Sequence, residues 1–106
     1  IFIRYYKDLI VEDNIDIIKA KKLFSKGISL FNVYAICVSP KTNGLMEIMS
    51  TENLLKEVNS YGNYGIIALV KGRNKARKKS VRLIENWLVT HSDLTGFKSH
   101  YNQNSF

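Results

Sequence analysis

Residues 66–82 read Ile-Ile-Ala-Leu-Val-Lys-Gly-Arg-Asn-Lys-Ala-Arg-Lys-Lys-Ser-Val-Arg. The first five residues are apolar, which is typical of a strand that is buried on both faces of a sheet. Gly72 follows shortly afterwards, and an amphipathic pattern then extends over about 74–90 and predicts a helix. The chain therefore passes from a buried strand straight into a helix whose first turns are strongly basic.

Apolar periodicity and the positions of capping and turn residues predict the elements on either side of this stretch. A helix is expected to begin at a cap formed by Asp13 or Asn14 and to end near Gly27. In chain order, we expect a strand over 1–11, that helix, a strand over 31–38, a turn over 40–44, a strand over 45–49, a helix from Ser50 or Thr51 to about 60, the strand over 66–70 and the helix over 74–90.

The last fifteen residues show weak periodicity and end in a polar stretch. They predict a loosely ordered tail with a short strand around 97–101. A chain of 106 residues has the length of a single domain. We therefore expect one α+β domain over 1–91, followed by a C-terminal tail over 92–106.

The element order β-α-β-β-α-β-α predicts a small mixed or antiparallel sheet with helices packed on it. Its first six elements match the connectivity of a ferredoxin-like fold. That fold places its first and third strands at the centre of the sheet, whereas here the second and fourth strands, over 31–38 and 66–70, are the more apolar. A three-layer arrangement, or a mixed sheet with another strand order, therefore stays open.

Positive charge is concentrated in the second half of the chain. The net charge is +7, of which residues 58–106 contribute +6 and residues 1–57 contribute +1. No Asp or Glu occurs over 58–84, a range that contains seven basic residues. With 45% apolar residues the chain has a globular rather than a disordered composition. A regional excess of this kind favours an anionic partner.

The single cysteine, Cys37, excludes an intrachain disulfide and a metal site built from cysteines. It lies in an apolar run, so we expect a buried structural thiol in a cytoplasmic protein. No apolar run approaches the roughly twenty residues needed to cross a bilayer. Residues 71–74 contain too few glycines for a nucleotide-binding loop, and no cofactor is expected. Because the chain begins at Ile1 rather than Met, its natural N-terminus is expected upstream.

On a helical wheel, the basic and apolar residues of the last helix fall on opposite faces, except Arg77, which points toward the apolar side. A solvated polar face explains the basic stripe simply, because like charges on a helix cost only a few tenths of a kcal/mol per pair. An anionic ligand is favoured by the absence of acids before Glu85 and by cations at the positive end of the helix dipole. The basic stripe is Lys75, Lys78, Lys79 and Arg82, and the apolar face is Ala76, Val81, Leu83, Ile84, Trp87 and Leu88.

We therefore predict a nucleic-acid-binding accessory protein that contacts the phosphates of DNA or RNA. Gly72 would let a ligand approach the backbone closely. Tyrosines at 5, 6, 61 and 64 are candidate stacking platforms, although amphipathic residues at the edge of the core are the simpler interpretation. An Asp or Glu from the first half of the chain placed across the basic surface would contradict the prediction. The expected contact residues are Lys71, Arg73, Lys75, Arg77, Lys78, Lys79 and Arg82.

Enzymatic activity is not expected from this sequence. The spacing of His91, Asp93 and His100 matches no standard pattern of metal ligands. Glu47 with Lys71 nearby would be a candidate nuclease carboxylate, but such sites gather several carboxylates around Mg²⁺. We therefore expect neither catalytic residues nor a bound metal.

A protein-interaction or regulatory module is the alternative function. Exposed sheet edges and the aromatic C-terminal segment would dock an acidic protein or a second copy in a homodimer. An anionic membrane surface is less favoured as a partner, because the Trp and Leu residues of the basic helix are needed in the core.

Overall fold

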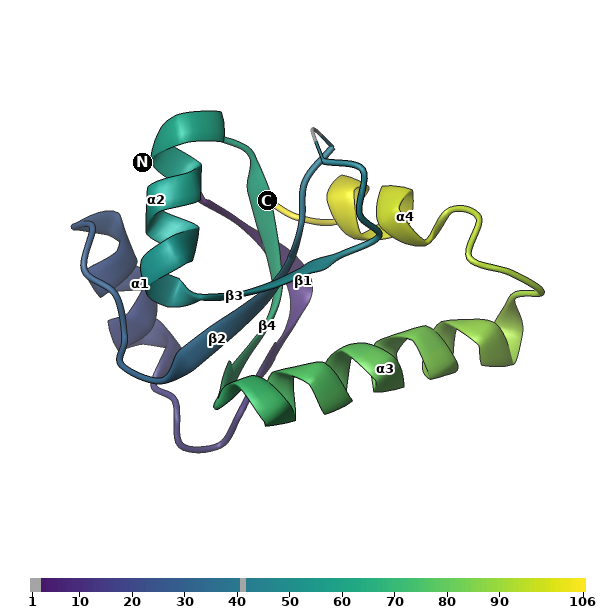
Figure 1. The fold of residues 1–106 in the computed structure, drawn as a ribbon, viewed down its shortest axis with the longest axis horizontal. Helices are drawn as coiled ribbons and strands as arrows, with labels where there is room; N and C mark the ends of the chain where they lie inside the picture. The colour runs from purple at the N-terminus through teal and green to yellow at the C-terminus, as the bar shows by residue number, and fades with distance from the viewer. Residues whose placement is uncertain (1–2, 41) are drawn as a thin grey trace.

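The computed structural model describes residues 3–40 and 42–106, so residues 1 and 2 of the first predicted strand and Lys41 of the predicted turn lie outside it. Within the described residues, the strands are β1 (Ile3–Val11), β2 (Val33–Val38), β3 (Glu47–Ser50) and β4 (Tyr64–Lys71). They form one mixed sheet in the order β1-β4-β2-β3 (Figure 1). β1 runs parallel to β4, whereas β2 is antiparallel to both of its neighbours. The predicted α+β class with a mixed sheet is confirmed.

The central strands are β4 and β2, and nearly every residue of both is buried. Their apolar runs lack the alternation of a half-exposed strand, which is what burial on both faces requires. The ferredoxin-like arrangement is not found, because it needs the first and third strands at the centre. Here β1 and β3 are the edge strands of the sheet.

Helices cover both faces of the sheet, which gives the three layers that the sequence left open (Figure 1). β4 contributes side chains to both faces. Ile66 belongs to the apolar cluster formed with the first two helices, and Ile67 belongs to the cluster formed with the last two. The helices are α1 (Ile17–Ser25) and α2 (Thr51–Tyr61) on one face, and α3 (Arg73–Thr90) and α4 (Phe97–Gln103) on the other.

The caps of α1 and α2 explain where these helices begin. α1 follows Asp16, whose carboxylate accepts a backbone N–H of the first turn at 3.1 Å, so the expected cap at Asp13 or Asn14 is wrong. α2 follows Ser50, whose hydroxyl accepts a first-turn N–H at 3.2 Å. None of the helices in the described part of the chain combines the length and the apolar composition that crossing a membrane requires.

The C-terminal residues form α4 where the sequence predicts a short strand. Its Phe97 and Tyr101 lie four positions apart and are buried in the same cluster as Ile67. The chain then runs along the outer edge of β1, where Tyr5 and Phe106 exchange backbone hydrogen bonds of 2.9 and 3.0 Å. This segment therefore contributes to the core and covers one edge of the sheet.

Candidate nucleic-acid interface

The turn from β4 into α3 depends on the backbone conformation of Gly72. This residue caps α3 with φ of 84° and ψ of 141°, a region that side chains make costly. Its N–H donates to the carbonyl oxygen of Asn32 at 2.8 Å. A Cβ added at Gly72 would meet no atom within 4 Å. The glycine is thus favoured by its dihedral angles, and its predicted role in letting a ligand approach the backbone closely stays a prediction.

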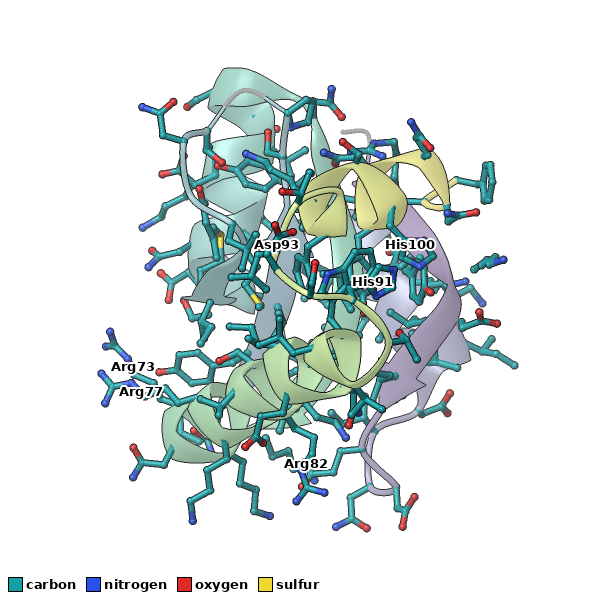
Figure 2. The ribbon with its side chains drawn as sticks, turned by 90° about the vertical axis from the view of Figure 1, so that its right-hand side faces the viewer. Arg73, Arg77, Arg82, His91, Asp93 and His100 are labelled. Atoms are coloured by element: carbon teal, nitrogen blue, oxygen red, sulfur yellow. The ribbon has the colours of Figure 1, made fainter. Side chains whose placement is uncertain are left out.

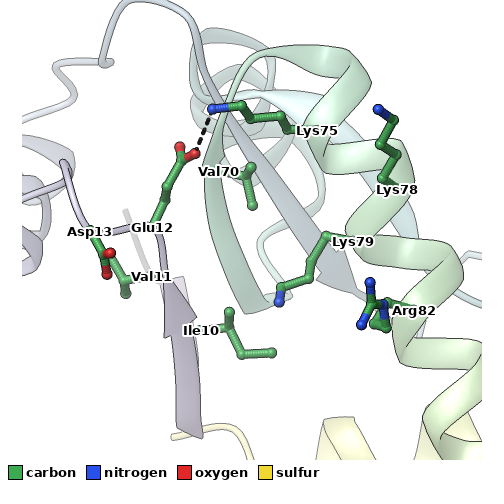
Figure 3. A pocket seen from close by; sticks show the side chains of 9 residues that line it. All are labelled: Ile10, Val11, Glu12, Asp13, Val70, Lys75, Lys78, Lys79 and Arg82. Carbon is green, nitrogen blue, oxygen red and sulfur yellow. Dashed lines mark hydrogen bonds and ion pairs between the residues drawn. The ribbon is translucent and has the colours of Figure 1, made fainter.

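A groove of about 490 Å³ lies between the end of β1 and the first half of α3 (Figure 3). Four basic side chains of α3 form one wall, and the opposite wall is the end of β1 with the two acidic residues that follow it. Apolar side chains from β1 and β4 complete the lining. The lining residues are Ile10, Val11, Glu12, Asp13, Val70, Lys75, Lys78, Lys79 and Arg82.

Glu12 is the carboxylate that the sequence did not place here. Its Oε1 lies 3.0 Å from Nζ of Lys75, and its Oε2 accepts the backbone N–H of Lys71 at 2.7 Å. The Lys71 hydrogen bond and the Lys75 ammonium hold the pKa of Glu12 below its usual value. Glu12 and Asp13, from the first half of the chain, therefore lie across the basic surface, which is the placement expected to contradict a polyanion partner. Glu12 neutralises one cation of that surface, so the case for such a partner now rests on the remaining cations alone.

The other basic residues of the groove keep their charge free for a ligand. Among the described residues the ion pairs are Lys75–Glu12 and Lys56–Glu52, so Lys78, Lys79 and Arg82 have no acidic partner there. These three cations occupy the second and third turns of α3, beyond the first turn where the helix dipole disfavours a positive charge most.

The seven expected contact residues do not converge on one site. Lys75, Lys78, Lys79 and Arg82 share the groove, whereas the side chain of Lys71 lines a different pocket. Arg73 and Arg77 lie together on another side of the first turns of α3, away from Arg82 (Figure 2). Four of the seven predicted residues therefore form a common surface.

The apolar face of α3 is narrower than the helical wheel predicts. Ala76 and Leu83 are buried, but Val81 is 55% exposed and Leu88 is 43% exposed. α3 has eighteen residues and reaches beyond the end of the sheet (Figure 1), so its later turns have less to pack against.

Of the tyrosines proposed as stacking platforms, the three whose side chains the structure describes have partners within the protein or are buried. Tyr64 is 2% exposed, and burial together with the neighbouring Glu47 raises its pKa to about 12. Nζ of Lys21 lies 4.5 Å from the centre of the Tyr5 ring. Tyr6 packs against the ring of Tyr101 and hydrogen-bonds His100. These three tyrosines are therefore residues of the core or its edge rather than platforms for a base. The side chain of Tyr61 lies outside the described part of the chain.

The candidate metal and catalytic residues have structural contacts instead. The rings of His91 and Trp87 stack with their centres 3.7 Å apart. Nε2 of His100 lies 3.1 Å from the Tyr6 hydroxyl, and the three candidate ligands lie around α4 and the loop before it (Figure 2). Within the described residues, no group of three His, Cys, Asp or Glu side chains could hold a metal ion.

Glu47 and Lys71 do not form a common site either. Glu47 pairs with Cys37 near one end of β2, whereas Lys71 pairs with Val33 at its other end. Burial raises the pKa of the Cys37 thiol, as expected for a structural cysteine.

Phe31 is the exposed aromatic residue that sequence reasoning assigned to a buried strand. β2 begins at Val33, and the side chain of Phe31 is 99% exposed in the turn before it. The aromatic and apolar neighbours of Phe31 in the sequence do not reveal its exposure, because exposure at a turn leaves no periodic pattern.

Comparison of the chain with protein-family models, with curated proteins and with solved structures found no match.

Proposed function

We propose that the protein binds nucleic acid through phosphate contacts made by the groove face of α3. The observation that carries this proposal is the set of three cations without acidic partners, Lys78, Lys79 and Arg82, which line one groove. Phosphate oxygens would give these side chains the charge-assisted hydrogen bonds that no carboxylate of the described chain supplies.

The acids of the groove limit the strength of this binding. Four cations and two carboxylates line it, and Glu12 is occupied by Lys75 and by the Lys71 N–H. We therefore expect about three phosphates, rather than four or more, to be neutralised. The logarithm of the association constant should then fall against the logarithm of salt concentration with a slope of roughly −2 for a single strand and −2.7 for a duplex.

The test is fluorescence anisotropy with labelled oligonucleotides at about 50 and about 200 mM salt. The variant Lys78→Gln, Lys79→Gln, Arg82→Gln should lose most of the binding and most of the salt dependence. A matched control exists on α1, where Lys21→Gln and Lys22→Gln, with Lys26→Gln just after the helix, remove the same charge from the opposite layer. The control should keep its affinity within about threefold.

Two results would contradict this function. One is binding that does not respond to salt. The other is an equal loss in the α3 variant and the α1 control, which would show that net charge alone, and not the groove, attracts the oligonucleotide.

Docking of a protein is the second candidate function, and exposed apolar residues on α3 favour it. Val81, Leu88 and Val89 are 55, 43 and 81% exposed. Such residues would contact an acidic partner or a second copy of the chain. Light scattering tests the second case: a stable dimer whose formation blocks the basic groove would favour self-association over nucleic-acid binding.

A further inference from the structure

We propose that the nucleic acid is single-stranded and that one of its bases stacks on Phe31, an inference that rests on the function proposed above. A fully exposed Phe exposes a large apolar ring to water, and flat nucleobases cover such rings in single-strand-binding proteins. At 99%, Phe31 is more exposed than any other large apolar side chain that the structure describes.

The backbone on both sides of Phe31 is fixed. The N–H and C=O of Leu30 both hydrogen-bond the hydroxyl of buried Thr51, at 2.9 and 2.8 Å. Asn32 has φ of 56°, and its carbonyl accepts the N–H of Gly72 at 2.8 Å. The ring is therefore presented from a backbone tied to the starts of α2 and α3, so little conformational entropy is lost when a base stacks on it.

A second pocket, of about 270 Å³, lies beside Phe31 and contains polar groups that suit a base or its phosphate. The amide of Asn14 can both donate and accept, and the ammonium groups of Lys19 and Lys71 can donate. One oxygen of Asp16 is already occupied, because it caps α1. The lining residues are Asn14, Ile15, Asp16, Lys19, Ala20, Leu30, Phe31, Val33 and Lys71.

The Phe31 pocket and the basic groove meet at one end of the sheet. Asp13 lines the groove, and the next residue, Asn14, lines the pocket. In β4, likewise, Val70 lines the groove and Lys71 lines the pocket. Successive side chains of a strand point to opposite faces, so the two sites lie on opposite sides of this end. The loop after β1 passes there, between α1 and the start of α3 (Figure 1).

This geometry discriminates between single strands and duplexes. A single strand is flexible enough to turn over the end of the sheet, with phosphates in the groove and a base on Phe31. A duplex cannot do so, because it is stiff over about 50 nm and its bases are already stacked. The three free cations of α3 would bind either form, whereas Phe31 adds affinity only for the single strand.

Phe31→Ala tests the inference with a single strand of about 20 nucleotides and with the duplex of the same sequence. The substitution should weaken single-strand binding by roughly 5- to 150-fold, the equivalent of about 1–3 kcal/mol for one stacked base, and leave duplex binding unchanged. Phe31→Tyr should keep the affinity and Phe31→Leu should not, because stacking needs an aromatic face. Phe106→Ala is the matched control, since Phe106 is 75% exposed and lies at the edge of β1.

A single strand that contains 2-aminopurine gives a second measurement. Stacking changes its fluorescence, so the wild type should change the signal on binding and Phe31→Ala should not. Because Phe31 makes no buried contact, its substitution should leave the thermal midpoint unchanged.

The possible results separate this inference from the proposed function. If the α3 variant loses binding while Phe31→Ala stays within about twofold of wild type, stacking is overturned and the phosphate function stands. Equal weakening of single-strand and duplex binding by Phe31→Ala also overturns stacking. If no oligonucleotide binds, both proposals fall. If light scattering shows that Phe31→Ala changes the oligomeric state of the protein, stacking is overturned and Phe31 belongs to a protein interface instead.

Discussion

Glu12 controls the electrostatics of the groove at the scale of a single residue. It joins the end of β1 to the end of β4, by accepting the backbone N–H of Lys71, and to the start of α3, by pairing with the Lys75 ammonium group. An anion at this position also compensates the positive end of the helix dipole, which has no acidic residue in the first turn of α3 itself. The carboxylate thus occupies, from within the chain, the place that a phosphate would otherwise favour.

The depressed pKa of Glu12 makes its contribution to stability dependent on pH. The folded pKa lies below the unfolded value, so the stabilisation is present above about pH 4.5 and is lost as pH falls through the folded pKa. Glu12→Gln should therefore lower the urea midpoint at about pH 7, and its difference from the wild type should shrink as pH falls below about 4.5 toward about 3. A difference between the two proteins that stays constant over this range would contradict the assigned pairing.

At the scale of elements, the sequence predicts best the strands that are formed by continuous apolar runs. The strands predicted over 31–38 and 66–70 correspond to β2 and β4, and their central position follows from burial on both faces. α4 was missed because a helix of seven residues with two buried side chains leaves almost no periodic signal. Phe31 was assigned to a strand because its neighbours are apolar, although the strand begins two residues later.

α4 should contribute measurably to the stability of the fold. Phe97 is fully buried and contacts the rings of Trp87 and Tyr101, so Phe97→Ala should cost about 3–5 kcal/mol of unfolding free energy. Phe106→Ala removes the same atoms from an exposed position and should change the value by less than about 0.5 kcal/mol. Urea denaturation measures both.

Phe97→Leu provides a smaller change if Phe97→Ala fails to fold. It leaves a smaller cavity, so its unfolding free energy should lie between those of Phe97→Ala and Phe106→Ala. Equal stability of Phe97→Ala and Phe106→Ala would show that α4 does not support the core.

At the scale of the whole molecule, the distribution of charge was only partly predictable. The helical wheel predicts Lys75, Lys78, Lys79 and Arg82 on one stripe, and these four residues line the groove together. It could not reveal the acids of the opposite wall, because Glu12 and Lys75 are 63 positions apart and meet only in the folded chain. It also could not show that Arg73 and Arg77 lie away from the groove, since that depends on where α3 packs on the sheet.

Asp13 should oppose the binding of a polyanion to the groove. It is exposed, and no ion pair is found for it among the described residues. Asp13→Asn should therefore raise oligonucleotide affinity by about two- to fivefold at low salt, with less effect at high salt. Glu52→Gln, on the exposed side of α2, is the control for the same change of net charge. An equal gain in both variants would indicate a long-range effect rather than a local one.

The pairing of residues 104–106 with β1 has a consequence for behaviour in concentrated solution. Backbone groups of Tyr5 and Lys7 that would otherwise face a neighbouring molecule are bonded to Phe106 and Asn104. The opposite edge strand, β3, has only four residues. Long unprotected edges are templates for aggregation, so this capped and shortened sheet resists joining other copies strand to strand.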